Sequence, residues 1–141
     1  MSSAYLVYDN NTGKILKDGV CPLSAVPLQA YVVGTTGITH SEDGIRQSDQ
    51  YINLSDEAII DRPDNTAILA VGDDEITADG IDEANITNIP LGSTYTIRGS
   101  VYAYGDVSDT TLDFSTDTEG KYTITIESFP EKRISFIVEA V

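Results

Sequence analysis

Short runs of alternating apolar and polar residues, separated by turn-forming residues, dominate this chain of 141 residues. The plainest run is 121–128, in which Tyr122, Ile124 and Ile126 alternate with polar residues. Because successive side chains of a strand point to opposite faces of a sheet, this period of two predicts a strand with one buried face. The other runs have similar length and spacing, and they fit a β-sandwich better than any helical arrangement. The chain is therefore predicted to be all-β.

The residues that lead into this strand predict a tyrosine corner. In an immunoglobulin-like β-sandwich, a Tyr near the start of the penultimate strand bonds through its hydroxyl to the backbone of the preceding turn. Tyr122 stands two residues before Ile124, which is an expected core position, and Gly120 supplies the permissive backbone of the corner. Gly120, Tyr122 and Ile124 are accordingly the predicted structural residues of an immunoglobulin-like sandwich.

Six further strands are predicted around this one in the second part of the chain. They lie at 67–71, 83–89, 94–98, 101–104, 111–114 and 133–140, with turn signals at 90–92, 105–106 and 129–131. In the last of them Ile134, Phe136 and Val138 are expected to face the core. Seven short strands with regular turn signals are typical of this sandwich.

The first part of the chain predicts two β-hairpins. One has strands 4–8 and 14–17, and the other has strands 51–54 and 58–61. Between them we expect an irregular connection or one helical turn at 23–26, a strand at 29–33 and a polar loop at 39–49. The two hairpins are predicted to form one small antiparallel sheet.

A domain boundary is predicted at Arg62-Pro63, because proline biases the preceding residue to an extended conformation and no periodic pattern crosses it. Residues 1–62 carry four basic and eight acidic side chains, a net charge of −4, and residues 63–141 carry four and fifteen, a net of −11. The predicted organisation is an N-terminal β-hairpin anchoring module, 1–62, followed by the sandwich, 63–141.

The formal net charge of −15 argues against partners that carry negative charge, which means nucleic acids and anionic membrane surfaces. A lone cysteine, Cys21, allows no intrachain disulfide. The sequence contains neither an export signal nor an apolar run long enough for a membrane span. We therefore expect no membrane partner and synthesis in the cytoplasm of the producing cell.

Candidate chemistry is sparse. The acidic segment 73–83 offers Asp73, Asp74, Asp79 and Asp82 as a cation cluster, but their spacing matches no defined calcium loop and solvated acidic turns are the simpler interpretation. His40, the only histidine, has no second ligand or nucleophile placed with it and is interpreted as a solvated loop residue. No nucleophile elbow or paired-carboxylate arrangement is present. We predict no enzyme, no catalytic residue, no metal site and no cofactor.

Several segments resemble small structural proteins of tailed bacteriophages and their immunoglobulin-like C-terminal modules. The segments that carry the resemblance are 5–15, 51–63, 76–86, 89–93, 120–124 and 129–130.

The resemblance implies a virion component, made in the bacterial host, whose partners are other tail, fibre or capsid proteins. It favours a tail or tail-fibre-associated protein that docks through its N-terminal module and exposes the immunoglobulin-like domain. A capsid decoration protein and a fibre-assembly chaperone absent from the mature particle are the alternatives, and homo-oligomerisation stays open.

Overall fold

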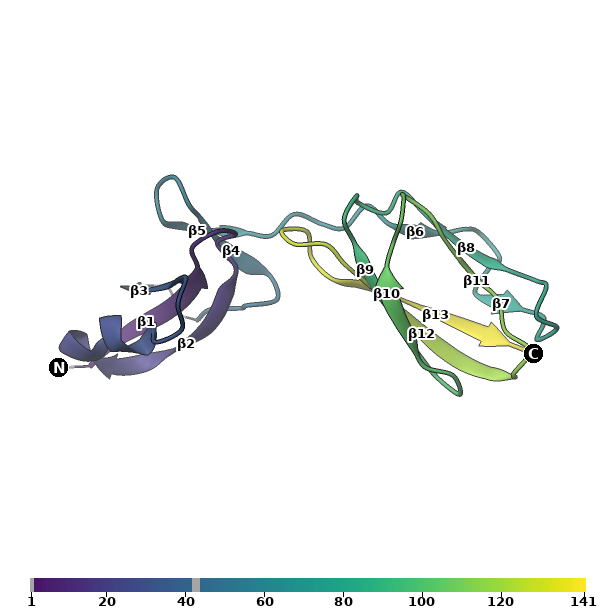
Figure 1. Cartoon of the computed structure of the whole chain (residues 1–141), viewed down its shortest axis with the longest axis horizontal. Helices are drawn as coiled ribbons and strands as arrows, with labels where there is room; N and C mark the ends of the chain where they lie inside the picture. Colours follow the sequence, from purple (N-terminus) through teal and green to yellow (C-terminus); the bar gives the residue numbers. More distant parts are fainter. Residues whose placement is uncertain (1, 42–43) are drawn as a thin grey trace. The chain divides into compact units, whose positions relative to one another are not determined.

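The computed structural model describes residues 2–41 and 44–141, which are all-β apart from two short 3-10 helices (Figure 1). The chain divides into two compact units, Met1–Pro63 and Asp64–Val141. The division lies one residue after the boundary predicted from the sequence.

The N-terminal unit is built on a three-stranded antiparallel sheet. Its strands are β1 (Ser2–Asp9), β2 (Ile15–Pro22) and β3 (Thr35–Thr39), in the order β2-β1-β3. The hairpin of β1 and β2 confirms the first predicted hairpin, with longer strands. The edge strand β3 was not predicted, because its sequence, Thr-Thr-Gly-Ile-Thr, holds a single large apolar residue.

The connection from β2 to β3 covers one face of this sheet. It contains η1 (Leu23–Ala25) and η2 (Pro27–Gln29), which confirms the predicted helical turn. The strand predicted at 29–33 is wrong, because Gln29 ends η2 and Ala30 to Val33 form no ladder. Val26 is the buried anchor of this segment and packs against Tyr5 and Val7 of β1.

The second hairpin, β4 (Gln50–Asn53) and β5 (Ala58–Asp61), packs on the other face of the sheet. Its Ile52 is buried in a cluster with Leu6, Tyr8 and Ile15. The hairpin forms a sheet of its own, so the prediction of one sheet for both hairpins is wrong. Besides this cluster, the backbones of the two hairpins meet at one end, where the Ile52 amide donates to the Gly13 carbonyl at 2.8 Å and Lys14 forms an isolated antiparallel bridge with Tyr51.

The C-terminal unit is an immunoglobulin-like β-sandwich (Figure 1). Its strands are β6 (Ile68–Leu69), β7 (Glu75–Ile76), β8 (Ala84–Thr87), β9 (Thr94–Arg98), β10 (Ala103–Asp106), β11 (Leu112–Phe114), β12 (Gly120–Glu127) and β13 (Ile134–Ala140). One sheet has the order β10-β9-β12-β13-β7 and the other β11-β8-β6. In the A-to-G lettering of immunoglobulin domains these orders are C′-C-F-G and E-B-A, with β7 as a continuation of strand A that pairs in parallel with strand G.

Each of the seven predicted strands of the sandwich corresponds to a strand of the structure in the same order, and β7 is an eighth strand that was not predicted. Residues 94–98 coincide with β9, and Val138 of β13 is buried while Ile134 and Phe136 pack against the core. Gly105 and Asp106, interpreted as a turn, instead end the strand β10. Gly105 lies opposite Tyr95, whose ring occupies the space beside the missing side chain, and this explains a glycine within the strand.

The tyrosine corner is present at the start of β12. The Tyr122 side chain is fully buried, and its hydroxyl donates a hydrogen bond of 2.7 Å to the Thr118 carbonyl. Its ring packs on Phe114 of the opposite sheet with centroids 5.0 Å apart. Gly120 has φ +143°, a conformation that side chains rarely adopt, and Ile124 is buried in the core.

Candidate functional site

The four aspartates considered as a cation cluster serve as acceptors of backbone hydrogen bonds or lie exposed. Asp79 accepts from the amides of Ile81 and Asp82, both at 2.8 Å, and Asp82 accepts from the Thr77 amide at 2.8 Å. The bonds from these amides, that of Asp82 first, hold the pKa of Asp79 below its usual value.

The other two aspartates do not complete a ligand set. Asp73 accepts from the Asn85 amide at 2.8 Å, and Asp74 is exposed. Within residues 2–41 and 44–141, no group of three or more His, Cys, Asp and Glu side chains has metal-binding geometry.

His40 lies directly after β3, and its ring is half-buried rather than fully solvated as predicted. Its backbone amide donates to the Ala4 carbonyl at 3.2 Å and so extends the β1–β3 ladder. Its Nδ1 has no hydrogen-bond partner among the described residues.

A set of exposed apolar side chains instead marks the N-terminal unit. The segment from η1 to the start of β3 exposes Leu23, Leu28, Tyr31, Val32 and Val33, each between 59 and 100%. We call these five residues the N-terminal apolar surface. They follow one another within eleven residues, whereas single exposed apolar residues elsewhere need no explanation.

Local structure explains why these side chains stay outside the core. Two tight 3-10 turns joined at Val26 leave little regular surface to face the sheet, and Val26 is itself the buried residue of the segment. The segment is nevertheless held in place, because the Lys17 ammonium lies 4.4 Å from the centroid of the Tyr31 ring.

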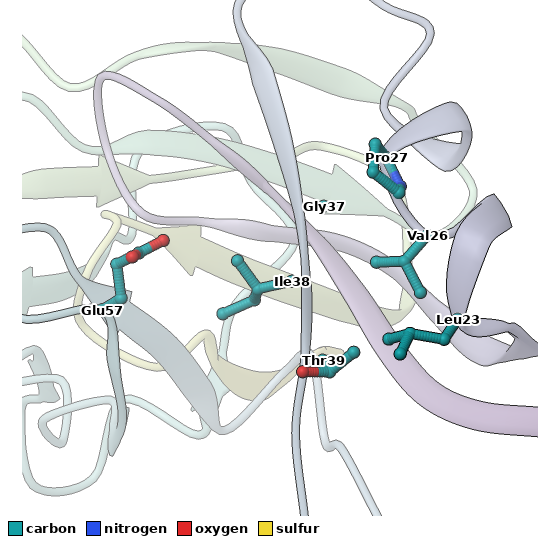
Figure 2. A pocket seen from close by; sticks show the side chains of 7 residues that line it. All are labelled: Leu23, Val26, Pro27, Gly37, Ile38, Thr39 and Glu57. Atoms are coloured by element: carbon teal, nitrogen blue, oxygen red, sulfur yellow. The ribbon is translucent and has the colours of Figure 1, made fainter.

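A groove of about 460 Å³ runs beside this surface along β3 (Figure 2). We call it the β3 groove. It is lined by Leu23, Val26, Pro27, Gly37, Ile38, Thr39 and Glu57. Figure 2 shows β3 passing between the η1–η2 residues on one side and Glu57, from the turn between β4 and β5, on the other.

The strand that lines this groove has one edge without a partner strand. In the β1–β3 ladder the His40 amide bonds Ala4, and the Gly34 carbonyl accepts from the Asn10 amide at 2.9 Å. Because hydrogen-bonded residues alternate along an antiparallel strand, the even-numbered residues of β3 bond β1. Thr35, Gly37 and Thr39 therefore direct their N–H and C=O groups away from β1. Among the described residues no backbone bond to these groups is formed from another strand or turn.

Glu57 forms the polar side of the groove in a conformation that is costly for a non-glycine residue. Its φ is +58°, and its carboxylate accepts a 2.8 Å hydrogen bond from the buried Tyr8 hydroxyl. Burial, reinforced by the adjacent Glu57 carboxylate, raises the pKa of Tyr8 above its usual value, so this hydroxyl remains a donor at neutral pH. The carboxylate is thus held in place at the groove.

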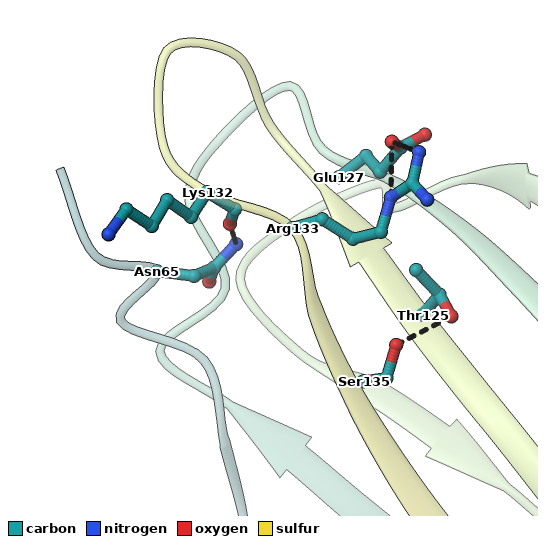
Figure 3. Close-up of polar contacts among 6 residues, drawn as sticks. All are labelled: Asn65, Thr125, Glu127, Lys132, Arg133 and Ser135. Carbon is teal, nitrogen blue, oxygen red and sulfur yellow. Dashed lines mark hydrogen bonds and ion pairs between the residues drawn. The ribbon is translucent and has the colours of Figure 1, made fainter. Parts of the chain in front are cut away.

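The outer face of the larger sandwich sheet has a different character. Arg133 Nε donates to Glu127 at 2.7 Å, and Thr125 bonds Ser135 at 2.9 Å across β12 and β13 (Figure 3). The Asn65 side chain donates to the Lys132 carbonyl at 3.1 Å nearby. Exposed hydroxyls and paired charges suit a solvated surface.

No protein-family model matches the chain, and neither the curated proteins nor the solved structures contain a significant match. In the part of the chain that the structure describes, no helix has the length and apolar character needed to cross a membrane.

The candidate site differs from the residues singled out by sequence. Gly120, Tyr122 and Ile124 meet at the corner as structural residues, and the four aspartates form no common site. The β3 groove and the N-terminal apolar surface were missed. The signal for them was the apolar run Tyr31-Val32-Val33 followed by Gly34, which was interpreted as a strand instead of an exposed connection.

Proposed function

We propose that the protein is a non-enzymatic structural component of a tailed-bacteriophage virion, associated with the tail or a tail fibre. Its N-terminal unit docks on another virion protein, and its immunoglobulin-like unit is exposed. The observation that carries this proposal is the N-terminal apolar surface, which another protein would bury. This surface belongs to the less charged unit, whose net charge is −4.

The sandwich supports the exposed role. Six of its nine large exposed apolar side chains are separated along the chain, and the other three, Val101, Tyr102 and Tyr104, lie together near the start of β10. Its fifteen acidic residues keep a displayed domain soluble and resistant to association. The resemblance of sequence segments to phage structural proteins supports the same assignment.

Incorporation into particles tests the division of labour. Leu28→Ser/Val33→Ser removes two side chains of the N-terminal apolar surface, and Ile81→Ser/Leu91→Ser is the matched control in the sandwich, since all four residues are at least 72% exposed. We expect the first double variant to fold and be lost from particles, and the control to be incorporated normally. Residues 63–141 alone should fold and stay in solution, while the N-terminal unit fused to a carrier should bind particles.

Normal incorporation of the isolated sandwich, with the N-terminal fusion left in solution, would reverse the assignment. Copy counting by mass spectrometry of purified particles then separates the alternatives. A decoration protein is present in far more copies than a tail component, and an assembly chaperone is absent.

A further inference from the structure

We propose that the β3 groove binds an extended segment of the virion partner, which adds to the N-terminal sheet as a fourth strand beside β3. The segment carries apolar side chains on the face toward η1–η2 and a lysine or arginine on the face toward Glu57. This inference rests on the proposed docking function and names the chemistry of the partner.

The backbone of β3 supplies the affinity. Thr35, Gly37 and Thr39 each direct one N–H and one C=O away from β1, which is the arrangement that a strand-shaped ligand completes by main-chain hydrogen bonds. A β3 of five residues offers these groups along its whole length.

The walls of the groove supply the specificity. Leu23, Val26 and Pro27 form an apolar wall on one side of β3, and the Glu57 carboxylate lies on the other side (Figure 2). Because side chains of an added strand alternate between these two sides, the ligand must alternate apolar and basic residues.

The two edges of the sheet also differ in how they resist added strands. The β2 edge contains Lys17 and Pro22, residue types that protect an exposed edge from further pairing. The β3 edge contains no lysine, arginine or proline. The unprotected edge is the one that borders the groove.

Charge identifies a different protein, and not a second copy, as the occupant. Two copies each carry −15, and self-pairing of β3 would place threonines, glycine and isoleucine beside Glu57 without a cation. A basic segment of a partner removes both penalties.

The test uses the full-length protein and a synthetic peptide, acetyl-Lys-Val-Lys-Val-Lys-Val-Lys-amide. We expect it to bind and to shift the NMR signals of residues 35–39. N-methylation of the valines removes the peptide N–H donors that would face β3. The N-methylated peptide should therefore bind at least about 10-fold more weakly. A peptide with glutamate in place of lysine should show no binding.

Two protein variants separate the contribution of backbone hydrogen bonds to peptide binding from that of the Glu57 charge. Thr39→Pro removes an outward N–H while leaving the bonds of Ile38 and His40 to β1, so the variant should fold and lose the peptide. Glu57→Gln should weaken the lysine peptide several-fold. Equal binding of the N-methylated and parent peptides, or no binding of the parent peptide, would overturn the strand-addition proposal even if Thr39→Pro failed to fold.

Incorporation of the parent protein and of Thr39→Pro into particles distinguishes a failure of the groove proposal from a failure of the proposed function. Loss of Thr39→Pro from particles that accept the parent protein supports both. Peptide binding by a parent protein that never enters particles supports the groove and contradicts the virion function. Normal incorporation of a folded Thr39→Pro variant overturns the groove as the docking site and leaves the virion function standing.

Discussion

Tyr122 shows how much of this fold a single residue can specify. Its hydroxyl reaches the Thr118 carbonyl at 2.7 Å, and the Thr116 hydroxyl lies 3.3 Å away. The ring fills the space beside Gly99, where an added Cβ would lie 2.6 Å from a ring carbon. The sequence predicted this corner because it depends on local spacing, from the turn to the start of one strand.

Replacement of Tyr122 by phenylalanine should cost about 0.5 to 1.5 kcal/mol of unfolding free energy, the net value of one buried hydrogen bond. The cost should lie in the lower part of the roughly 0.5 to 3 kcal/mol that such a loss can reach, because Thr118 is exposed and water can bond its carbonyl once the hydroxyl is removed. Urea unfolding measures the change. Tyr104→Phe is the control, since Tyr104 is 73% exposed and should change the free energy by no more than a few tenths of a kcal/mol. Equal stability of Tyr122→Phe and the parent would count against the role of the corner.

At the scale of elements, the N-terminal unit depends on the close approach of two hairpins at Gly13. An added Cβ there would lie 2.0 Å from the Ile52 carbonyl oxygen, so the hairpin turn and β4 fit together only around a glycine. The turn was predicted from Asp9 to Gly13, but its contact with β4 was not, since no local pattern encodes a junction between segments so far apart.

Alanine at Gly13 should therefore destabilise the N-terminal unit more than alanine at Gly34. Both glycines have positive φ, +79° and +85°, which alone costs about 1 to 2 kcal/mol for another residue. Gly34 has open space around it, whereas Gly13→Ala also loses the bond to the Ile52 amide, worth about 1 kcal/mol more. Hydrogen exchange of the Ile52 amide measures the junction directly. Similar losses for both variants would show that the junction is unimportant.

The elements that sequence reasoning missed share a physical cause. Strands β3 and β7 hold few apolar residues, and each exists because a neighbouring strand offers it a backbone partner. The residues at 31–33 are apolar but exposed. Apolar alternation therefore identified strands that bury one face. It failed where a segment pairs without burying apolar side chains, and where apolar side chains lie in a segment that pairs with no strand. The β3 groove was missed for the same reason.

At the scale of the whole molecule, negative charge is concentrated on the sandwich. Glu75 and Glu139 are direct partners in the parallel pairing of β7 and β13, and both are exposed. Like charges placed opposite each other destabilise a sheet.

Sodium chloride should accordingly raise the melting temperature of the sandwich, because salt weakens the repulsion among its exposed acidic side chains and, at a Debye length of about 8 Å, largely removes it beyond that distance. Glu75→Gln should raise the melting temperature at low salt and reduce the salt dependence. Micromolar calcium chloride at constant ionic strength should change nothing. A rise with calcium and none with sodium chloride would restore the cation-site interpretation of the acidic segment.

The parallel pairing of β7 and β13 also bears on how the sandwich folds. Local hairpins form early because little chain entropy is lost, but this pairing joins residues 75 and 139 and places β13 between β12 and β7. The sheet cannot acquire its final order until the whole intervening chain has been arranged. We expect a slower folding phase for the sandwich than for the β1–β2 hairpin, and pulsed hydrogen exchange should protect the Val141 amide, which bonds Ile76, among the last.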